Sequence, residues 1–230
     1  MTSSTIDYPR LMSLAVHEFR TPASVVGGYL RMLHRDGEPL TERQQKMIEE
    51  AEKSCGRLVA LVNEMSELAK LDARLAKLAD SPIDVFGLVQ EVAAVVHEAS
   101  ERNVQLEARG PASGAMRSGD STRLKSAFDA IFRSVMREKA GPCTVVADCR
   151  TETLDGQRYA IIVVAEAANV AASYERQAGE FDDHRGGLGL ALPLARRAIE
   201  GHGGRLSAPE PIVENDPLTR GSAIITLPID

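Results

Sequence analysis

Residues 12–33, MSLAVHEFRTPASVVGGYLRML, decide the fold of the first part of the chain. Apolar and small residues recur in this stretch at alternating spacings of three and four, which is typical of a helix that packs against another helix. Pro22 lacks the N–H group that would bond to the carbonyl of Glu18, so the helix should bend there. We predict one long helix with a stripe formed by Met12, Ala15, Phe19, Pro22, Val26, Tyr29 and Leu33.

A turn and a second helix follow this stretch. Residues 34–39 are charged and contain Gly and Pro, and Thr41 with Glu42 has the composition of a helix start. The same spacing then continues through Ile48, Ala51, Cys55, Leu58, Val62, Met65 and Ala69. Two helices alone expose much apolar surface, so we predict that the hairpin pairs with a second copy in a dimeric four-helix bundle.

The remainder of the chain mixes helix and strand patterns after a linker at residues 79–82. Helices are predicted over residues 85–99, 123–138 and 188–200. Strands are predicted over residues 104–108, 143–151, 158–166 and 224–228. The second and third of these strands flank Leu154-Asp155-Gly156 as in a hairpin. We therefore expect an α/β sandwich with a mostly antiparallel sheet, and two domains over residues 1–78 and 79–230.

Composition excludes several classes of protein. The chain has 230 residues, a net charge of −6 and no Trp, which argues against a nucleic-acid partner. No apolar run approaches the roughly 20 residues that span a bilayer, and the first ten residues lack a signal pattern. We expect a cytoplasmic chain with no membrane insertion. The three cysteines and the histidines other than His17 lack metal-ligand spacing, so no metal site is predicted.

His17 is the candidate nucleophile. It lies two residues from both Ala15 and Phe19, so at about 100° per residue it faces away from the stripe. An imidazole with an ordinary pKa of about 6.5 is largely neutral and nucleophilic at cell pH. Glu18 lies beside the ring and can accept its proton, while Thr21 is one turn further on the same face. Taken singly, each of these residues fits the solvated face of an amphipathic helix.

Residues 17–22, HEFRTP, resemble the phosphoacceptor box of sensor histidine kinases, and the hairpin over residues 9–73 is similar to the dimerisation domain of that family. The resemblance implies that His17 takes the γ-phosphoryl group of ATP and passes it to an aspartate of a response-regulator receiver domain. Glu18 would be its acid–base partner. The pattern Glu-x-x-Thr also resembles the phosphatase motif of the family, in which Thr21 positions the water that dephosphorylates the regulator.

Residues 185–191, RGGLGLA, open a helix, and His-Gly-Gly follows at residues 202–204. Both stretches resemble the ATP-binding half of the same family, which has a Bergerat-like fold. Glycines at a helix N-terminus let backbone N–H groups approach phosphate, and the helix dipole adds attraction. Arg185 stands where the family has its first glycine, so it is either a phosphate contact or a block. The resemblance implies nucleotide contacts from Arg185, Gly186, Gly187, Leu188 and Gly189.

Other boxes depart from the family pattern. Ser134 stands where the family has an asparagine for magnesium, so a weaker oxygen ligand replaces an amide oxygen. Glu166 stands at the aspartate that reads the adenine amino group, and Ala168 and Val170 replace two glycines. The lid that the family carries over ATP falls on residues 171–184, which form a short and acidic segment here.

Three hypotheses follow from these patterns. The first is a dimeric histidine kinase that uses ATP and magnesium, phosphorylates His17 and has a response regulator as its partner. The second is a histidine phosphotransferase or regulator phosphatase that does not hydrolyse ATP, which accounts for Ser134, Ala168 and Val170. The third is a dimeric interaction module without phosphate chemistry, which the box at residues 17–22 argues against. We favour the first, because residues 186–189 suit the phosphates of a nucleotide.

Overall fold

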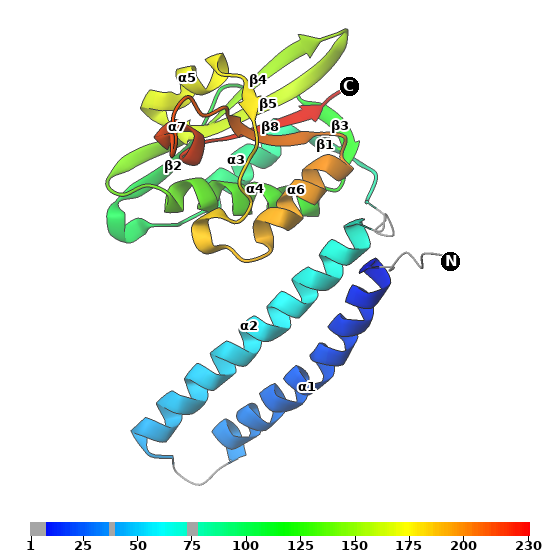
Figure 1. Cartoon of the computed structure of the whole chain (residues 1–230), viewed down its shortest axis with the longest axis vertical. Coiled ribbons are helices and arrows are strands. Elements are labelled where there is room, and N and C mark those ends of the chain that lie inside the picture. Colours follow the sequence, from blue (N-terminus) through cyan, green and yellow to red (C-terminus); the bar gives the residue numbers. More distant parts are fainter. Residues whose placement is uncertain (1–7, 37–39, 73–77) are drawn as a thin grey trace. The chain divides into compact units, whose positions relative to one another are not determined.

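The computed structural model describes residues 8–36, 40–72 and 78–230. The chain divides into two units, residues 1–76 and 77–230. The first unit is a helical hairpin, and the second is an α/β domain with a mostly antiparallel sheet (Figure 1), so the predicted fold class is confirmed. Within the described part of the chain, no helix combines the length and the apolar character that crossing a membrane requires.

The hairpin consists of α1 (Tyr8–Asp36) and α2 (Glu42–Asp72). α1 continues through Pro22 without interruption, and it is curved in Figure 1. α2 begins with a capping box, in which the Thr41 hydroxyl accepts from the Gln44 N–H at 3.3 Å and the Gln44 side chain accepts from the Thr41 N–H at 3.0 Å. Residues 34–36 belong to α1 rather than to the predicted turn, and residues 37–39 lie outside the described residues.

The face that α1 turns toward α2 is not the predicted apolar stripe. Val16 and Gly27 are buried on α1, and Cys55, Val62 and Ala69 are buried at every seventh position of α2. A Cβ atom on Gly27 would lie 3.2 Å from Cys55 Sγ, so small side chains allow the helices to approach closely. The larger apolar residues are exposed in the single chain, namely Phe19, Val25, Val26, Tyr29, Met32, Leu33, Met47, Leu58 and Leu61.

The second unit is built on a six-stranded sheet with the order β2-β4-β5-β8-β7-β6. β2 and β4 are parallel, and the other neighbours are antiparallel. The strands are β2 (Val104–Arg109), β4 (Cys143–Leu154), β5 (Gln157–Glu166), β6 (Ala178–Gly179), β7 (Arg205–Pro209) and β8 (Ala223–Pro228). A separate antiparallel pair consists of β1 (Ser81–Asp84) and β3 (Met116–Gly119).

Helices cover this sheet unequally. They are α3 (Val85–Val95), α4 (Ser121–Arg137), α5 (Val170–Glu175), α6 (Ala191–Gly201) and α7 (Pro217–Arg220), with 3-10 turns η1 (Ser100–Arg102), η2 (Ala167–Asn169) and η3 (Arg185–Gly187). α3, α4 and α6 lie on one face, as Figure 1 shows, and bury Ile162 and Val164 of β5 in the main core. The alternate residues Ile161 and Val163 point to the opposite face, where they pack with Val170 of α5.

Most predicted elements of this unit are confirmed, and the linker prediction is wrong in part. The helices α3, α4 and α6 and the β4–β5 hairpin occur where they were expected. Asp155 and Gly156 have φ of +51° and +81°, the left-handed geometry that a two-residue hairpin turn favours. Ser81 and Pro82, expected in the linker, begin β1 instead. The sequence reading did not identify β3, β6, β7, α5 or α7 as elements.

Candidate functional site

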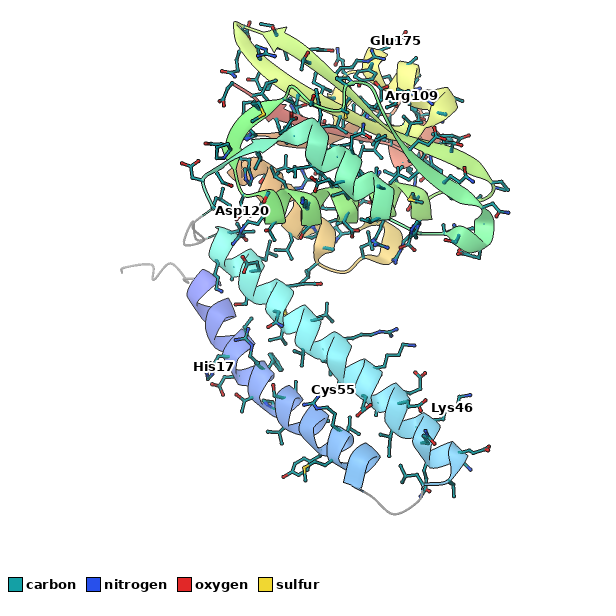
Figure 2. All side chains as sticks on the ribbon, turned by 180° about the vertical axis from the view of Figure 1, so that it is seen from behind. His17, Lys46, Cys55, Arg109, Asp120 and Glu175 are labelled. Atoms are coloured by element: carbon teal, nitrogen blue, oxygen red, sulfur yellow. The ribbon has the colours of Figure 1, made fainter. Side chains whose placement is uncertain are left out.

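The imidazole of His17 is open to solvent on α1. Its side chain is 75% exposed, and it points away from α2, whereas Cys55 lies between the two helices (Figure 2). Nδ1 lies 3.5 Å from a carboxylate oxygen of Glu18, whose side chain is also exposed. The Thr21 hydroxyl donates to the carbonyl of His17 at 3.5 Å. The predicted exposure of His17 is therefore confirmed, and the three polar groups do lie on one patch.

This arrangement gives the two ring nitrogens different surroundings. Because Nδ1 faces Glu18, the carboxylate is placed to accept a proton from that nitrogen. Nε2 is then the nitrogen left for an electrophile that arrives from solvent. Arg20, on the next turn, donates to the side-chain oxygen of Asn63 on α2 at 2.9 Å. That bond links α1 to α2 close to the reactive ring.

A pocket of about 420 Å³ lies in the second unit where α4, β5 and α7 end. Its lining includes Glu166, the residue predicted at the base-reading position. Lys139 donates from Nζ to the carbonyl of Gly221 at 2.9 Å, and burial lowers the pKa of Lys139 below its ordinary value. The pocket is lined by residues 138–140, Glu166, Asn169, Asn215, Pro217, Arg220 and Gly221.

Residues 185–189, here called the glycine segment, lead into α6. Gly186, Gly187 and Gly189 have φ of +70°, +62° and +61°, a left-handed geometry that disfavours side chains. α6 has no side-chain cap at its start and no acidic residue in its first turn. No carboxylate of its own first turn therefore offsets the positive end of its dipole. Leu188, also in this segment, packs against the main core.

Ser134 does not face the pocket. It is fully buried, and its hydroxyl donates to the carbonyl of Ile131 at 2.7 Å within α4. A Cβ atom on Gly186 would lie 3.3 Å from Ser134 Cα, so the glycine segment packs directly on this part of α4. The hydroxyl is thus committed inside the helix, and the residues present do not fit a magnesium ion bound by Ser134. Among the described residues, no group of three or more His, Cys, Asp or Glu is arranged to hold a metal ion.

Arg185 is buried, with 8% of its surface exposed, and its guanidinium lies 3.9 Å above the ring of Phe181. Nη1 donates to the carbonyls of Arg220 at 2.9 Å and Thr219 at 3.4 Å, at the end of α7. Burial lowers the pKa of Arg185 to about 10, so the group is still charged at neutral pH. Within the described residues, Nε and Nη2 of Arg185 and the Thr219 hydroxyl have no hydrogen-bond partner. Arg185 is therefore tied to α7 and does not line the pocket.

Residues 171–184, where the family carries its lid, pack in part onto the sheet. The Tyr174 hydroxyl donates to the carboxylate of Asp148 on β4 at 2.9 Å, which fastens α5 to the sheet. β6 pairs with β7, and Phe181 is 1% exposed in the main core. None of these residues lines the pocket.

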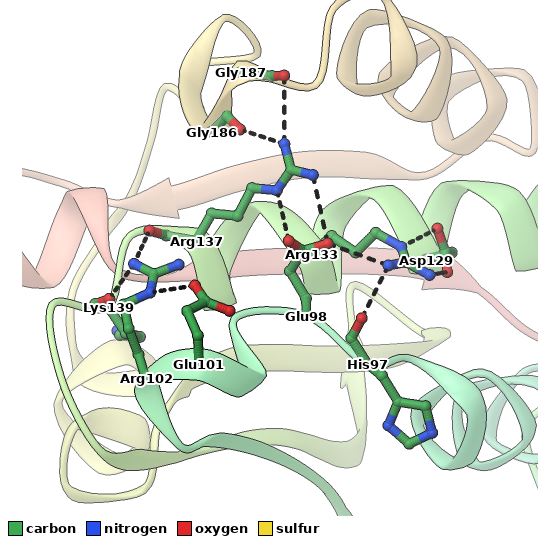
Figure 3. A network of polar contacts seen from close by, with 10 residues as sticks. All are labelled: His97, Glu98, Glu101, Arg102, Asp129, Arg133, Arg137, Lys139, Gly186 and Gly187. Atoms are coloured by element: carbon green, nitrogen blue, oxygen red, sulfur yellow. Dashed lines mark hydrogen bonds and ion pairs between the residues drawn. The ribbon is translucent and has the colours of Figure 1, made fainter. Parts of the chain in front are cut away.

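A network of charged side chains surrounds the end of α4 (Figure 3). Arg137 donates to the carbonyls of Gly186 at 3.0 Å and Gly187 at 3.4 Å, and to the carboxylate of Glu98 at 3.0 Å. Arg133, one turn earlier, donates to the same carboxylate at 3.2 Å. Sequence reasoning missed Arg137 and Glu98. The spacing of the two arginines on one helix face was the available signal, but nothing in the sequence pointed to Glu98 as their shared partner.

Known proteins with the same organisation agree with this geometry. Residues 10–74 match the His Kinase A (phospho-acceptor) domain. The histidine protein kinase DivJ of Caulobacter vibrioides is 26% identical over 210 residues, covering 86% of this chain and 34% of that protein. The signal transduction histidine-protein kinase BaeS of Escherichia coli is 23% identical over 226 residues, covering 93% of this chain and 45% of that protein. Residues 10–74 therefore belong to the His Kinase A family, and the chain as a whole has the organisation of a sensor histidine kinase core.

Solved structures agree with the fold of the kinase core. Full-length ShkA in complex with AMPPNP superimposes with a TM-score of 0.68 at 22% identity, covering 96% of this chain and 46% of that chain. The histidine kinase AdeS of Acinetobacter baumannii superimposes with a TM-score of 0.51 at 15% identity, covering 93% of this chain and 97% of that chain. The kinase core spans less than half the length of DivJ and BaeS.

His202 is a structural residue that connects α6 to the start of α4 in the kinase core. Its Nε2 accepts from the Asp120 N–H at 2.9 Å, and its Nδ1 lies 2.6 Å from the carbonyl of Ala198. Burial lowers the pKa of His202, so the ring is neutral at cell pH. A Cβ atom on Gly204 would lie 2.4 Å from the carbonyl of Thr226, so only glycine fits at that position. The His-Gly-Gly stretch therefore holds α6 against β8 and the start of α4.

Proposed function

We propose that this kinase core transfers the γ-phosphoryl group of ATP to His17 and from there to an aspartate of a response-regulator receiver domain. The observation that carries the proposal is the exposed imidazole of His17, with the Glu18 carboxylate 3.5 Å from Nδ1. The match of residues 10–74 to the His Kinase A domain supports it, because that domain is a phospho-acceptor.

Each polar side chain on α1 has a separate role in the proposed reactions. Nε2 of His17 forms a bond to the γ-phosphorus and displaces ADP as the leaving group. Positive charge develops on the ring, and Nδ1 releases its proton to the carboxylate of Glu18. In the second transfer, an aspartate oxygen of the receiver domain forms a bond to phosphorus, and the P–N bond to His17 breaks. In a separate phosphatase reaction, Thr21 would position a water that attacks the aspartyl phosphate, which releases inorganic phosphate and the free aspartate.

The second unit supplies residues that fit a nucleotide. Glu166 in the pocket wall would accept a hydrogen bond from the amino group of the base. The uncapped start of α6 would attract the phosphates together with the backbone N–H groups of Gly187, Leu188 and Gly189. Magnesium would enter with the phosphates, because Ser134 is not available as a ligand. In this proposal ATP supplies the phosphoryl group, and the residues of the second unit orient the nucleotide.

The exposed apolar side chains of the hairpin support a homodimer as part of this proposal. Phe19, Val26, Tyr29 and Leu33 are each more than half exposed on α1, and Leu58 is similarly exposed on α2. Monomeric proteins rarely expose so many large apolar side chains on one element. A second hairpin would cover them in a four-helix bundle and leave His17 on the outer surface.

A phosphotransferase or phosphatase without ATP hydrolysis is the second candidate. It is favoured by the internal hydrogen bond of Ser134, which leaves no side-chain ligand for magnesium at that position. Under this alternative His17 and Thr21 act as proposed, while the second unit takes no part in phosphate chemistry.

Incubation with magnesium and γ-labelled ATP tests the proposal, with His17→Gln as the matched control. We expect acid-labile label on the wild type and none on His17→Gln, followed by loss of label when a receiver domain is added. A protein that binds no ATP and carries no label, but accepts phosphate from a phosphorylated receiver domain, would favour the second candidate. Label that persists in His17→Gln would contradict both.

A further inference from the structure

Two arginines connect the glycine segment to two different helices. Arg137 on α4 donates from one nitrogen, Nη1, to the carbonyls of both Gly186 and Gly187 (Figure 3). Arg185, within the segment, donates to the carbonyls of Thr219 and Arg220 on α7. Hydrogen bonds from a charged donor are stronger than those between neutral groups. The segment is therefore attached at once to α4 and to α7.

Arg137 is itself held in place by Glu98. The carboxylate accepts from Nε of Arg137 at 3.0 Å and from Nη1 of Arg133 at 3.2 Å. Burial acts to raise the pKa of Glu98, but the hydrogen bonds from Arg137 and Arg133 lower it overall, so the carboxylate is ionised at neutral pH. Arg133 makes two further bonds to Asp129, at 2.8 and 3.0 Å. The Arg137 side chain thus has a fixed direction toward the glycine segment.

The glycine segment lies in direct contact with α4 at Gly186. Gly186 packs on Ser134 so closely that a Cβ atom would meet Ser134 Cα at 3.3 Å. The pocket that contains Glu166 includes no residue of the glycine segment in its lining. A nucleotide with its base beside Glu166 and its phosphates at the start of α6 must extend across both regions. The segment must therefore move away from α4 before such a ligand fits.

We propose that Arg137 closes the nucleotide site by holding Gly186 and Gly187 against α4, and that nucleotide binding requires release of these two carbonyls. This inference rests on the proposed function, because it concerns regulation of the same nucleotide site. The apparent affinity for nucleotide is reduced by the fraction of molecules in which the segment is closed. Removing the guanidinium therefore raises the affinity, whereas a guanidinium that served as a phosphate ligand would lower the affinity when removed.

Arg133 provides a matched control for this test. Arg133 and Arg137 lie one turn apart on α4, and both bind Glu98, but only Arg137 reaches the glycine segment. We would measure binding of ADP with magnesium to wild type, Arg137→Met and Arg133→Met by calorimetry. The inference requires about tenfold tighter binding by Arg137→Met, because loss of hydrogen bonds from a charged donor is worth a change of this size. Arg133→Met should stay within about twofold of wild type. Unchanged or weaker binding by Arg137→Met would overturn the inference.

Hydrogen exchange without nucleotide separates this inference from the proposed function. Backbone amides in residues 185–190 should exchange faster in Arg137→Met than in Arg133→Met, because only the first variant frees the segment. Equal exchange in the two variants would overturn the closure. Faster exchange with no ADP binding by any of the three proteins would overturn the proposed nucleotide site, and the gate with it. Faster exchange with equal ADP affinities would overturn the inference alone.

Discussion

The phosphoacceptor patch on α1 and the glycine segment before α6 are held very differently. The ring of His17 is open to solvent beside Glu18, and the backbone carbonyl of His17 accepts from the hydroxyl of Thr21. The glycine segment is tied to α4 through Arg137 and to α7 through Arg185. Under the two proposals, side-chain chemistry sets the rate in the first region, and a backbone rearrangement precedes nucleotide binding in the second. The two regions therefore call for different tests.

The largest effect should come from the acid–base partner in the open region. Glu18→Gln removes the group that accepts the Nδ1 proton, so the initial rate of His17 labelling should fall by about a hundredfold or more. Thr21→Ala, on the same face, should leave labelling within about twofold and slow dephosphorylation of the regulator instead. Labelling time courses with γ-labelled ATP measure both rates. Equal labelling by Glu18→Gln and wild type would remove the acid–base role.

Two phenylalanines, one in each unit, give the next largest contrast. Phe132 is fully buried beside Phe128 in the main core, so Phe132→Ala should destabilise the second unit by about 3–5 kcal/mol. Phe19 is 61% exposed, so Phe19→Ala should have little effect on the fold of a single chain and should weaken the dimer instead. Urea denaturation and sedimentation measure these effects. A dimer unaffected by Phe19→Ala would place the dimer interface elsewhere.

Replacement of Arg185 should change the stability of the second unit by a smaller amount than Phe132→Ala, and it should stabilise the unit rather than destabilise it. Two of its nitrogens are buried with no hydrogen-bond partner in the part of the chain that the structure describes, which is costly for a cation. Arg185→Met keeps the apolar packing on Phe181 and removes the charge, although it also leaves the carbonyls at the end of α7 without their donor. We expect the free energy of unfolding to rise by up to about 1 kcal/mol. A clear loss of stability in urea denaturation would show that the bonds to α7 outweigh the buried charge.

The smallest effect concerns pH and His202. Its pKa is lower in the folded protein than the ordinary value, so folding favours the neutral ring. The stability that this provides is present above the ordinary pKa and is lost as the pH falls through the folded pKa. The melting temperature of the second unit should therefore decrease from pH 7.5 to pH 5, and less so in His202→Asn. Asp120, whose pKa is lowered by backbone hydrogen bonds despite its burial, remains ionised over this range.

Local patterns in the sequence were sufficient for most elements. The heptad spacing predicted α1 and α2, and Asp155-Gly156 predicted the β4–β5 hairpin, because periodicity and turn chemistry are local properties of the sequence. The internal face of the hairpin was not predictable in the same way. The large side chains of Phe19 and Tyr29 favoured them as the residues of α1 that contact α2. The two helices instead approach each other at Gly27 and Cys55. Close approach depends on small residues, which a pattern of large apolar residues does not reveal.

The candidate site was likewise predictable only where its residues are close together in the sequence. His17, Glu18 and Thr21 are adjacent on one helix, so their common patch followed from helix geometry alone. The roles of Ser134 and Arg185 depended on hydrogen bonds that no sequence motif indicates. A serine can bond back to its own helix, and an arginine can bind helix-end carbonyls, and neither outcome leaves a sequence signal.

The rate of label incorporation at His17, measured against ATP concentration in wild type and Arg137→Met, tests the central claim most directly. The account predicts acid-labile label on His17 in both proteins, with half-maximal labelling at about tenfold lower ATP concentration in Arg137→Met and a similar maximal rate. Absence of label from both proteins, or label on a residue other than His17, would contradict the account.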